Sequence, residues 1–399
     1  MLEQYLNHRT YILRKLLEID FDREMLQDAV RITTLQTRQG ILQGVNTTRE
    51  YPWDWSESRL PDSLKDVNEP LLSQLSKLHS QLLVLTEDYV TKATAKFPPR
   101  EYLCLPQLHR LLDEGHLMFK GVKVTPRFDS TYLTSSERRR FIKVFLIYEL
   151  SCRIKNEPHD LEILSRTVTK EEEAAIECVN TYTCSLYGAI IAQCTDTWLP
   201  DARTGPSLES GLLFPDNFYF DGSLYTIVLS SSENKLIVKV KSGVDFASLG
   251  LKHLTNLLQY DVSSCVGIEA LKNKLKHVWD LELRQECGRR WDWWHNMNLR
   301  NSDRRFREDY ESPMYRILSL ERNRGLQCSI YQQRAWPFFD DDRLYHQETR
   351  TRPIFPSKRF LLRQPNKQVF IGNWFNDPSR ERALRRSQRW HDEQNKTHD

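Results

Sequence analysis

Residues 136–155 carry hydrophobic side chains on every side of a helix rather than along a single stripe. A helix that is apolar all round belongs in the interior of a bundle. Thr134 and Glu137 have the Thr-x-x-Glu spacing of a capping box, which marks the start of this helix. The pattern therefore predicts a buried central helix with these inward residues: Phe141, Ile142, Val144, Phe145, Leu146, Ile147, Tyr148, Leu150, Cys152 and Ile154.

Amphipathic helices are expected on both sides of this central helix. Apolar residues recur at helical spacing in residues 2–18, 70–89 and 169–195, and the last of these begins at a second capping box, Thr169 with Glu172. Asp22 is placed to cap another helix in which Met25 and Ala29 face inward. A short helix is expected at residues 108–118, and longer ones at 244–260 and 266–286.

One segment has the pattern of a β-hairpin. In residues 224–241, two β-branched runs flank the polar sequence Ser-Ser-Ser-Glu-Asn. The predicted fold class is therefore mainly α, an irregular multi-helix bundle around a buried central helix (residues 136–155) with one small hairpin.

The domain organisation follows from a change of pattern at residues 198–223, which are rich in Pro and Gly and have no period. We expect an N-terminal helical subdomain (1–197), this loop or boundary (198–223), and a hairpin-plus-helix subdomain packed on the first (224–345). The remainder (346–399) reads as a basic tail punctuated by Pro.

Composition indicates an intracellular protein, cytoplasmic or nuclear. The eight cysteines are widely spaced without a Cys-x-x-Cys pair, which favours reduced, mostly buried thiols over a disulfide framework. No run approaches the roughly 18 apolar residues of a membrane span. The net charge of +3 over 399 residues does not by itself indicate a nucleic-acid binder.

No pattern of catalytic, cofactor-binding or metal-binding residues stands out. The chain lacks the phosphate-loop, dinucleotide-binding, nucleophile-elbow and zinc-protease motifs. Asp340, Asp341 and Asp342 are read as an acidic helix start rather than a Mg²⁺ site. The spacing of Cys178, Cys184 and Cys194 favours structural thiols over zinc ligands. The loose spacing of Cys104, His109 and His116 likewise does not favour a metal site.

The segment 289–307 interleaves arginine with tryptophan and is the candidate interaction surface. Three interpretations remain open: core tryptophans beside solvated arginines, a protein interface, or stacking on nucleic-acid bases. From residue 343 to 390, twelve Lys and Arg residues outnumber three acidic ones. The candidate interaction residues are Arg289, Arg290, Trp291, Trp293, Trp294, Arg304, Arg305 and Arg307.

Two blocks resemble segments that recur in large helical protein families of filamentous fungi, some of them described as F-box-like. The blocks are ERRRFIKVFLIYEL at 137–150 and QRAWPFFDDDRL at 333–344. The resemblance implies a fungal source and a helical fold, and it carries over no active-site residue. The N-terminus here lacks the Leu-Pro-x-Glu opening typical of an F-box.

The leading functional hypothesis is a non-enzymatic, intracellular protein-interaction or scaffold protein with an unidentified protein partner and without a cofactor or membrane attachment. One alternative is an enzyme of unrecognised class with its site in the helical core. Another is nucleic-acid binding through Arg289–Arg307 and the basic tail.

Overall fold

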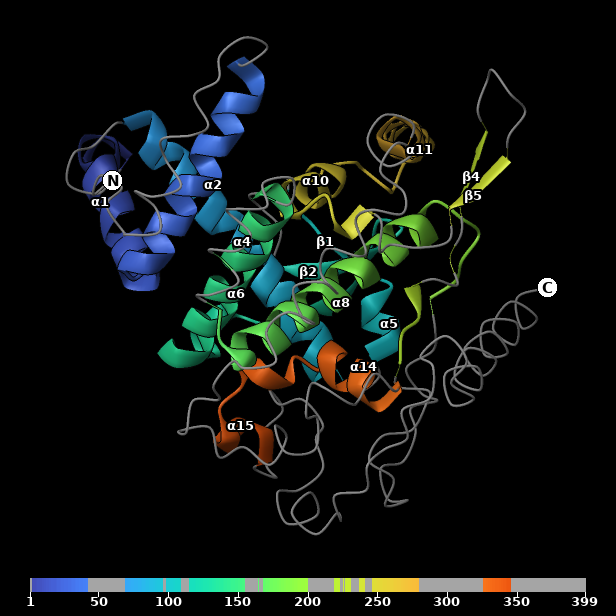
Figure 1. The fold of residues 1–399 in the computed structure, drawn as a ribbon. Helices are drawn as coiled ribbons and strands as arrows, with labels where there is room; N and C mark the ends of the chain where they lie inside the picture. Colours follow the sequence, from blue (N-terminus) through green and yellow to red (C-terminus); the bar gives the residue numbers. More distant parts are fainter. Residues whose placement is uncertain are drawn as a thin grey trace. The chain divides into compact units, whose positions relative to one another are not determined.

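A computed structural model describes residues 2–41, 69–95, 98–108, 115–154, 164, 168–199, 219–222, 225, 227–230, 237–240, 246–279 and 326–345. This part of the chain contains ten α-helices and two small antiparallel sheets (Figure 1), so the mainly-α prediction is confirmed. The contacts divide the chain into two compact units, Met1–Thr86 with Ser130–Val168 (unit 1) and Glu87–Asp129 with Thr169–Asp399 (unit 2). None of the described helices has the length and hydropathy needed to cross a bilayer.

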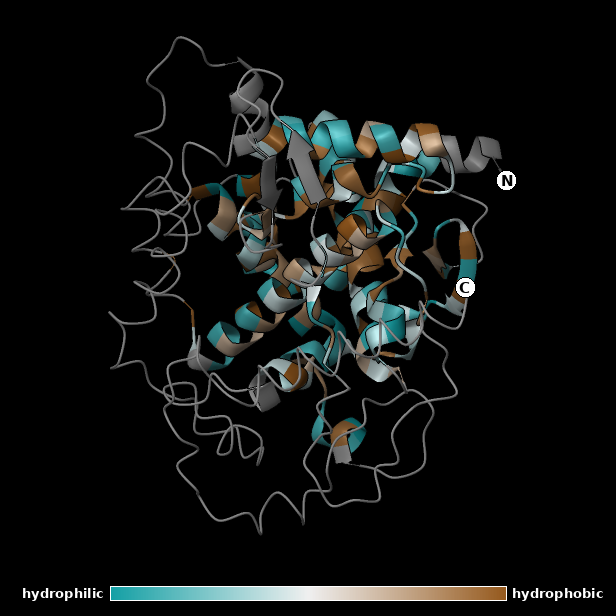
Figure 2. Cartoon of the chain, turned by 90° about the vertical axis from the view of Figure 1, so that its right-hand side faces the viewer, coloured by the Kyte–Doolittle hydropathy of each residue, from teal (hydrophilic) through white to brown (hydrophobic). Residues whose placement is uncertain are grey.

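Unit 1 contains the predicted buried helix, α6 (Ser135–Ile154), and all ten apolar residues expected to face inward are buried. Phe145 is 0% exposed and Tyr148 4%. Helices α1 (Leu2–Asp20) and α2 (Arg23–Ile41) pack on α6. Figure 2 shows hydrophobic and hydrophilic residues alternating along the coloured helices, as expected for elements with one inward face.

The start of α6 is fixed by the predicted capping box. The Glu137 backbone N–H donates to Thr134 Oγ1 (3.1 Å), and the Thr134 N–H donates to Glu137 Oε2 (3.0 Å). Asp22 caps α2 in the same way, because its Oδ1 accepts from the Met25 N–H at 3.0 Å. Each cap satisfies backbone donors that the first helical turn leaves unpaired.

Unit 2 is organised around α8 (Lys170–Gln193), which begins at the predicted Thr169–Glu172 capping box. The apolar residues at helical spacing in this helix are buried, as expected: Ala174, Ile176, Val179, Tyr182, Leu186, Tyr187, Ile190 and Ile191. The green α8 and the orange α14 (Leu326–Gln333) lie side by side in Figure 1. The other helices of the unit are α5 (Pro98–Tyr102), α10 (Leu251–Leu257), α11 (Cys265–Val278), the 3₁₀ turn η7 (Trp336–Phe338) and α15 (Asp341–Tyr345).

A three-stranded antiparallel sheet includes residues for which the sequence pattern predicts a helix. It consists of β1 (Leu105–Pro106), β2 (His116–Phe119) and β3 (Val122–Pro126) in the order β1-β2-β3. The helix expected at 108–118 is therefore wrong at its C-terminal end, and the hairpin at 224–241 is not the chain's one β element. Lys120 and Gly121, with φ of 46° and 84°, form a tight turn whose two positive φ values match the twist of the strands they join.

The hairpin predicted at 224–241 is confirmed in its two strands. Strand β4 (Ile227–Ser230) pairs antiparallel with β5 (Ile237–Val240), and the register pairs Ile227 with Val240 and Ser230 with Ile237.

The compact units follow different boundaries from the expected subdomains. Residues 130–168 group with the first 86 residues, whereas 87–129 group with the second half of the chain. The long helix α4 (Glu69–Thr94) contributes to both units. Within the expected boundary segment 198–223, only 198–199 and 219–222 are among the described residues, and the tail 346–399 lies outside them.

Candidate functional site

Two neighbouring pockets lie between α1 and the first half of α4, within unit 1. The larger, which we call the Asp20 pocket, has a volume of about 340 Å³, and the smaller, the Arg9 pocket, about 220 Å³. Leu13 lines both, so together they form the α1–α4 groove. The Asp20 pocket has apolar walls formed by Leu13, Leu16, Leu17, Ile19 and Leu83. Its polar lining consists of Asp20, Ser76, His79, Ser80 and Arg138.

Helical periodicity explains why the two pockets repeat along the groove. Thr10 lines the Arg9 pocket and Leu17 the Asp20 pocket, seven positions later on α1. On α4, Ser73 and Ser80 have the same relation. Seven residues are two helical turns, so the pockets are roughly 10 Å apart along the helices. The small serine side chains of α4 leave room between the helices, which larger residues would fill.

A charged cluster forms the polar side of the Asp20 pocket. Asp20 Oδ2, at the end of α1, is 2.6 Å from His79 Nε2 on α4 and 2.6 Å from Arg138 Nη2 on α6. Burial by itself would raise the pKa of Asp20, but the hydrogen bond from His79 and the charge of Arg138 outweigh it and hold the pKa below its ordinary value. An ionised carboxylate only accepts hydrogen bonds, so His79 Nε2 is the donor.

Apolar side chains are exposed next to this cluster. Leu16 is 49% exposed and Ile19 69%, and both line the Asp20 pocket. Tyr11, on the same helix, is 61% exposed. Three of the seven large hydrophobic residues that are exposed in the described part of the chain therefore lie on α1. Clustered exposed apolar residues beside a pocket are typical of a surface that another molecule covers.

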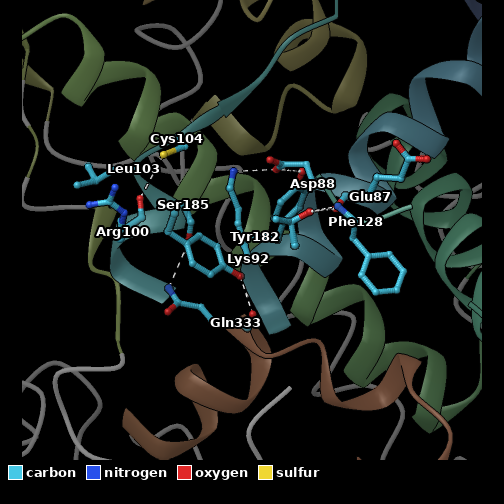
Figure 3. A network of polar contacts seen from close by, with 12 residues as sticks. Glu87, Asp88, Lys92, Arg100, Leu103, Cys104, Phe128, Tyr182, Ser185 and Gln333 are labelled. Atoms are coloured by element: carbon cyan, nitrogen blue, oxygen red, sulfur yellow. Dashed lines mark hydrogen bonds and ion pairs between the residues drawn. The ribbon is translucent and has the colours of Figure 1, made fainter. Parts of the chain in front are cut away.

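A second polar cluster lies in the core of unit 2 (Figure 3). Lys92 Nζ donates to Asp88 Oδ2 one turn earlier on α4 (2.7 Å), and the Tyr182 hydroxyl of α8 donates to the same oxygen (2.6 Å). The ammonium group also lies 5.8 Å from the ring centre of Tyr102 and 5.7 Å from that of Tyr182. Such distances allow cation–π attraction, which partly replaces the water that the charge has lost.

Both charges of this cluster are fully removed from solvent, since the side chains of Asp88 and Lys92 are 0% exposed. Burial raises the pKa of Asp88 and lowers that of Lys92, and their mutual attraction opposes both shifts. Shifted groups in a core are candidates for catalysis only where a substrate can reach them. The cluster therefore fits a structural role better than the enzyme site that the second hypothesis places in the helical core.

The C-terminal segment of unit 2 extends this network. Gln333 binds the backbone of Phe220 twice, accepting from its N–H (3.0 Å) and donating to its carbonyl (2.7 Å). The Tyr102 hydroxyl donates to the Gln333 carbonyl at 2.6 Å. Arg334, 0% exposed, donates to the carbonyls of Ala93 (2.9 Å) and Ala95 (2.7 Å) at the end of α4. The first residues of the block 333–344 thus hold the core together.

The predicted interaction residues Arg289, Arg290, Trp291, Trp293, Trp294, Arg304, Arg305 and Arg307 lie outside the described residues, as does nearly all of the basic segment from Arg343 onward. The Asp340 backbone carbonyl accepts from the Arg343 and Leu344 N–H groups (2.9 and 3.0 Å), and the first turn of α15 carries Asp341 and Asp342. Within the described residues, no three His, Cys, Asp or Glu side chains are grouped to hold a metal ion. Six cysteines are described as free thiols, four of them buried.

Sequence reasoning did not identify the α1–α4 groove. One signal was present, because α1 carries Tyr11 and Ile19 outside the apolar face formed by residues such as Leu13 and Leu17. An apolar stripe wider than one face needs a second covering surface. Asp20, His79 and Arg138 lie on three different helices, and their spacing in the sequence does not indicate that they meet.

Comparison of the whole chain with protein-family models, curated proteins and solved structures finds no match. The α1–α4 groove is therefore interpreted from its geometry alone.

Proposed function

We propose that the chain is a non-enzymatic protein-interaction protein and that a helix of its partner docks in the α1–α4 groove. The observation that supports this function is the pair of pockets spaced two turns apart between parallel rows of α1 and α4 side chains. Amphipathic helices bind such grooves by inserting side chains at positions i and i+7.

The exposed apolar residues support the same interpretation. Leu16 and Ile19 lie at the groove, and covering them would remove apolar area from water. Burial of apolar area stabilises an interface by roughly 25 cal/mol per Å² before the costs of association. An enzyme site, by contrast, must let a substrate reach its reacting groups. The Asp88–Lys92 pair is fully buried and has no exposed atoms for a substrate to reach.

Introducing negative charge at the groove tests the proposal. The Leu16→Glu/Ile19→Glu double variant places two carboxylates in the apolar wall, at positions that are exposed and outside the core. Full-length wild-type and variant proteins serve as bait in a host lysate, with quantitative mass spectrometry as the readout. Recovered candidates are then purified and tested for direct binding by calorimetry.

The control is Val266→Glu, which adds one carboxylate, against two in the groove variant, at an 81%-exposed apolar position on α11. We expect a directly binding protein whose affinity falls at least about tenfold in the groove variant and is unchanged in the control. Equal affinities for wild type, groove variant and control would overturn the groove as docking surface.

A further inference from the structure

We infer that the Asp20 pocket accepts a tyrosine side chain presented by the partner helix. This inference rests on the proposed docking function and specifies its chemistry. It follows from three features of the pocket: its apolar walls, the paired donor and acceptor on its polar side, and its position two turns from the Arg9 pocket.

The walls suit a bulky ring. Leu13, Leu16 and Leu83 line a space of about 340 Å³, which is large enough for an aromatic side chain. Aromatic residues bury about 150–250 Å² each and dominate interface energetics. Tyrosine and tryptophan are the aromatic residues most enriched among side chains that anchor protein interfaces. A ring packed against these leucines would also bring its far end toward Asp20 and Arg138.

The polar side of the pocket selects among aromatic residues. Asp20 is held ionised by Arg138 and His79 and can only accept a hydrogen bond, whereas Arg138 can only donate. The Arg138 side chain is 25% exposed, and its contact with Asp20 is made through Nη2, so other N–H groups of the guanidinium remain to donate to a ligand. A phenol hydroxyl can donate to the carboxylate and accept from the guanidinium at the same time.

The other candidate anchors match less well. Phenylalanine offers no polar atom, so the charged pair would lose water without replacement. Tryptophan can donate but not accept. A carboxylate would gain contact with Arg138 but would be repelled by the ionised Asp20, which already contacts that same arginine.

The groove also fixes where the tyrosine lies in the partner. Because the pockets are two turns apart, a helix whose residue i fills the Arg9 pocket presents residue i+7 to the Asp20 pocket. The expected partner segment is therefore an amphipathic helix with an anchor at i and tyrosine seven positions away.

Small probes test the pocket independently of any partner. Full-length protein with labelled leucine methyl groups is titrated with p-cresol, toluene and p-toluate, which share a ring and differ in the polar group. We expect p-cresol to shift the methyl resonances of Leu13, Leu16 and Leu83 with an affinity about tenfold above that of toluene, as one hydrogen bond to a charged group provides. Toluene or p-toluate binding as tightly as p-cresol would overturn the inference.

Two serine variants show whether the probe binds in this pocket. Ser80→Trp fills the Asp20 pocket, and Ser73→Trp fills the Arg9 pocket from the equivalent position two turns earlier. Both serines are exposed, so neither change disturbs the core. We expect Ser80→Trp to abolish the p-cresol shifts and Ser73→Trp to retain them; shifts that persist in Ser80→Trp contradict the site.

The two proposals fail separately. If the Leu16→Glu/Ile19→Glu variant abolishes partner binding while p-cresol shows no preference, docking stands and the tyrosine anchor is wrong. If p-cresol binds selectively while partner binding is unaffected in that variant, the pocket stands and the docking function is wrong.

Discussion

At the residue scale, the most demanding feature of the protein is the ion pair between Asp88 and Lys92 in the core of unit 2. Removing two charges from water is costly, and their attraction offsets that cost only when geometry and hydrogen bonds are good. Here the 2.7 Å contact, the Tyr182 hydroxyl and two aromatic rings provide that compensation. Each partner therefore depends on the other remaining in place.

Replacing Lys92 by Met should destabilise unit 2 strongly, because it leaves the Asp88 carboxylate buried without its cation. The expected loss in the free energy of unfolding is about 3–5 kcal/mol, measured by chemical denaturation. Lys77→Met is the matched control, an exposed lysine on the same helix, and should change stability by less than about 0.5 kcal/mol.

The double variant Asp88→Leu/Lys92→Met separates the ion pair from simple packing. It removes both charges together and should recover most of the loss seen in Lys92→Met, since neither charge then remains unpaired. If the double variant is less stable than either single variant, the intact ion pair itself stabilises the fold. The loss in Lys92→Met would then not come only from leaving Asp88 unpaired.

At the element scale, the ends of the helices can be predicted from residues a few positions apart, whereas the contacts between helices cannot. Thr134, Thr169 and Asp22 cap their helices as their positions in the sequence predict, because a cap involves residues only three apart. The strands β2 and β3 were missed because the consecutive apolar residues Leu117, Met118 and Phe119 fit a helix as well as a strand. Lys120 and Gly121, both with positive φ, form the tight turn that lets the two strands pair.

The contacts of Asp20 with His79 and Arg138, which join α1, α4 and α6, should make unit 1 sensitive to acid. The pKa of Asp20 is lowered in the folded protein, so the folded state binds this proton less readily than the unfolded chain. The stabilisation is complete above the ordinary aspartate pKa of about 4 and is lost as pH falls below it toward the lowered folded value.

Denaturant unfolding between pH 7 and pH 2 measures this effect. Wild type should lose stability more steeply below about pH 4 than Asp20→Asn, which cannot ionise at this position. Glu24→Gln serves as control, since its side chain is 75% exposed and contacts Lys143 only at 3.6 Å. Parallel pH profiles for wild type and Asp20→Asn would contradict the assignment.

At the scale of the whole molecule, unit 2 is closed by contacts between residues more than two hundred positions apart. The Tyr89 hydroxyl donates to the Gln332 carbonyl, Tyr102 to that of Gln333, and Arg334 to that of Ala93. Long-range closure of this kind costs chain entropy, which the buried hydrogen bonds and apolar contacts must offset.

Gln333→Ala should therefore weaken unit 2 as a whole. It leaves the backbone N–H and carbonyl of the buried Phe220 without their Gln333 partners, at about 1–3 kcal/mol for each group left unpaired. The thermal midpoint should fall by several degrees. The neighbouring Gln332→Ala, at a partly exposed position, should cost clearly less, and equal losses would show that the Phe220 contacts are not decisive.

Residue order alone is enough to predict the mainly-α class, the buried α6, the helix caps and the hairpin at 227–240. These features depend on periodicity and on neighbours within a few residues, which the order of amino acids states directly. The packing of distant segments, by contrast, sets the grouping of residues 130–168 with the first 86, the sheet of β1, β2 and β3, and the contacts of Asp20 with His79 and Arg138 beside a pocket. These depend on which surfaces pack together after distant segments meet, and no local pattern encodes that choice.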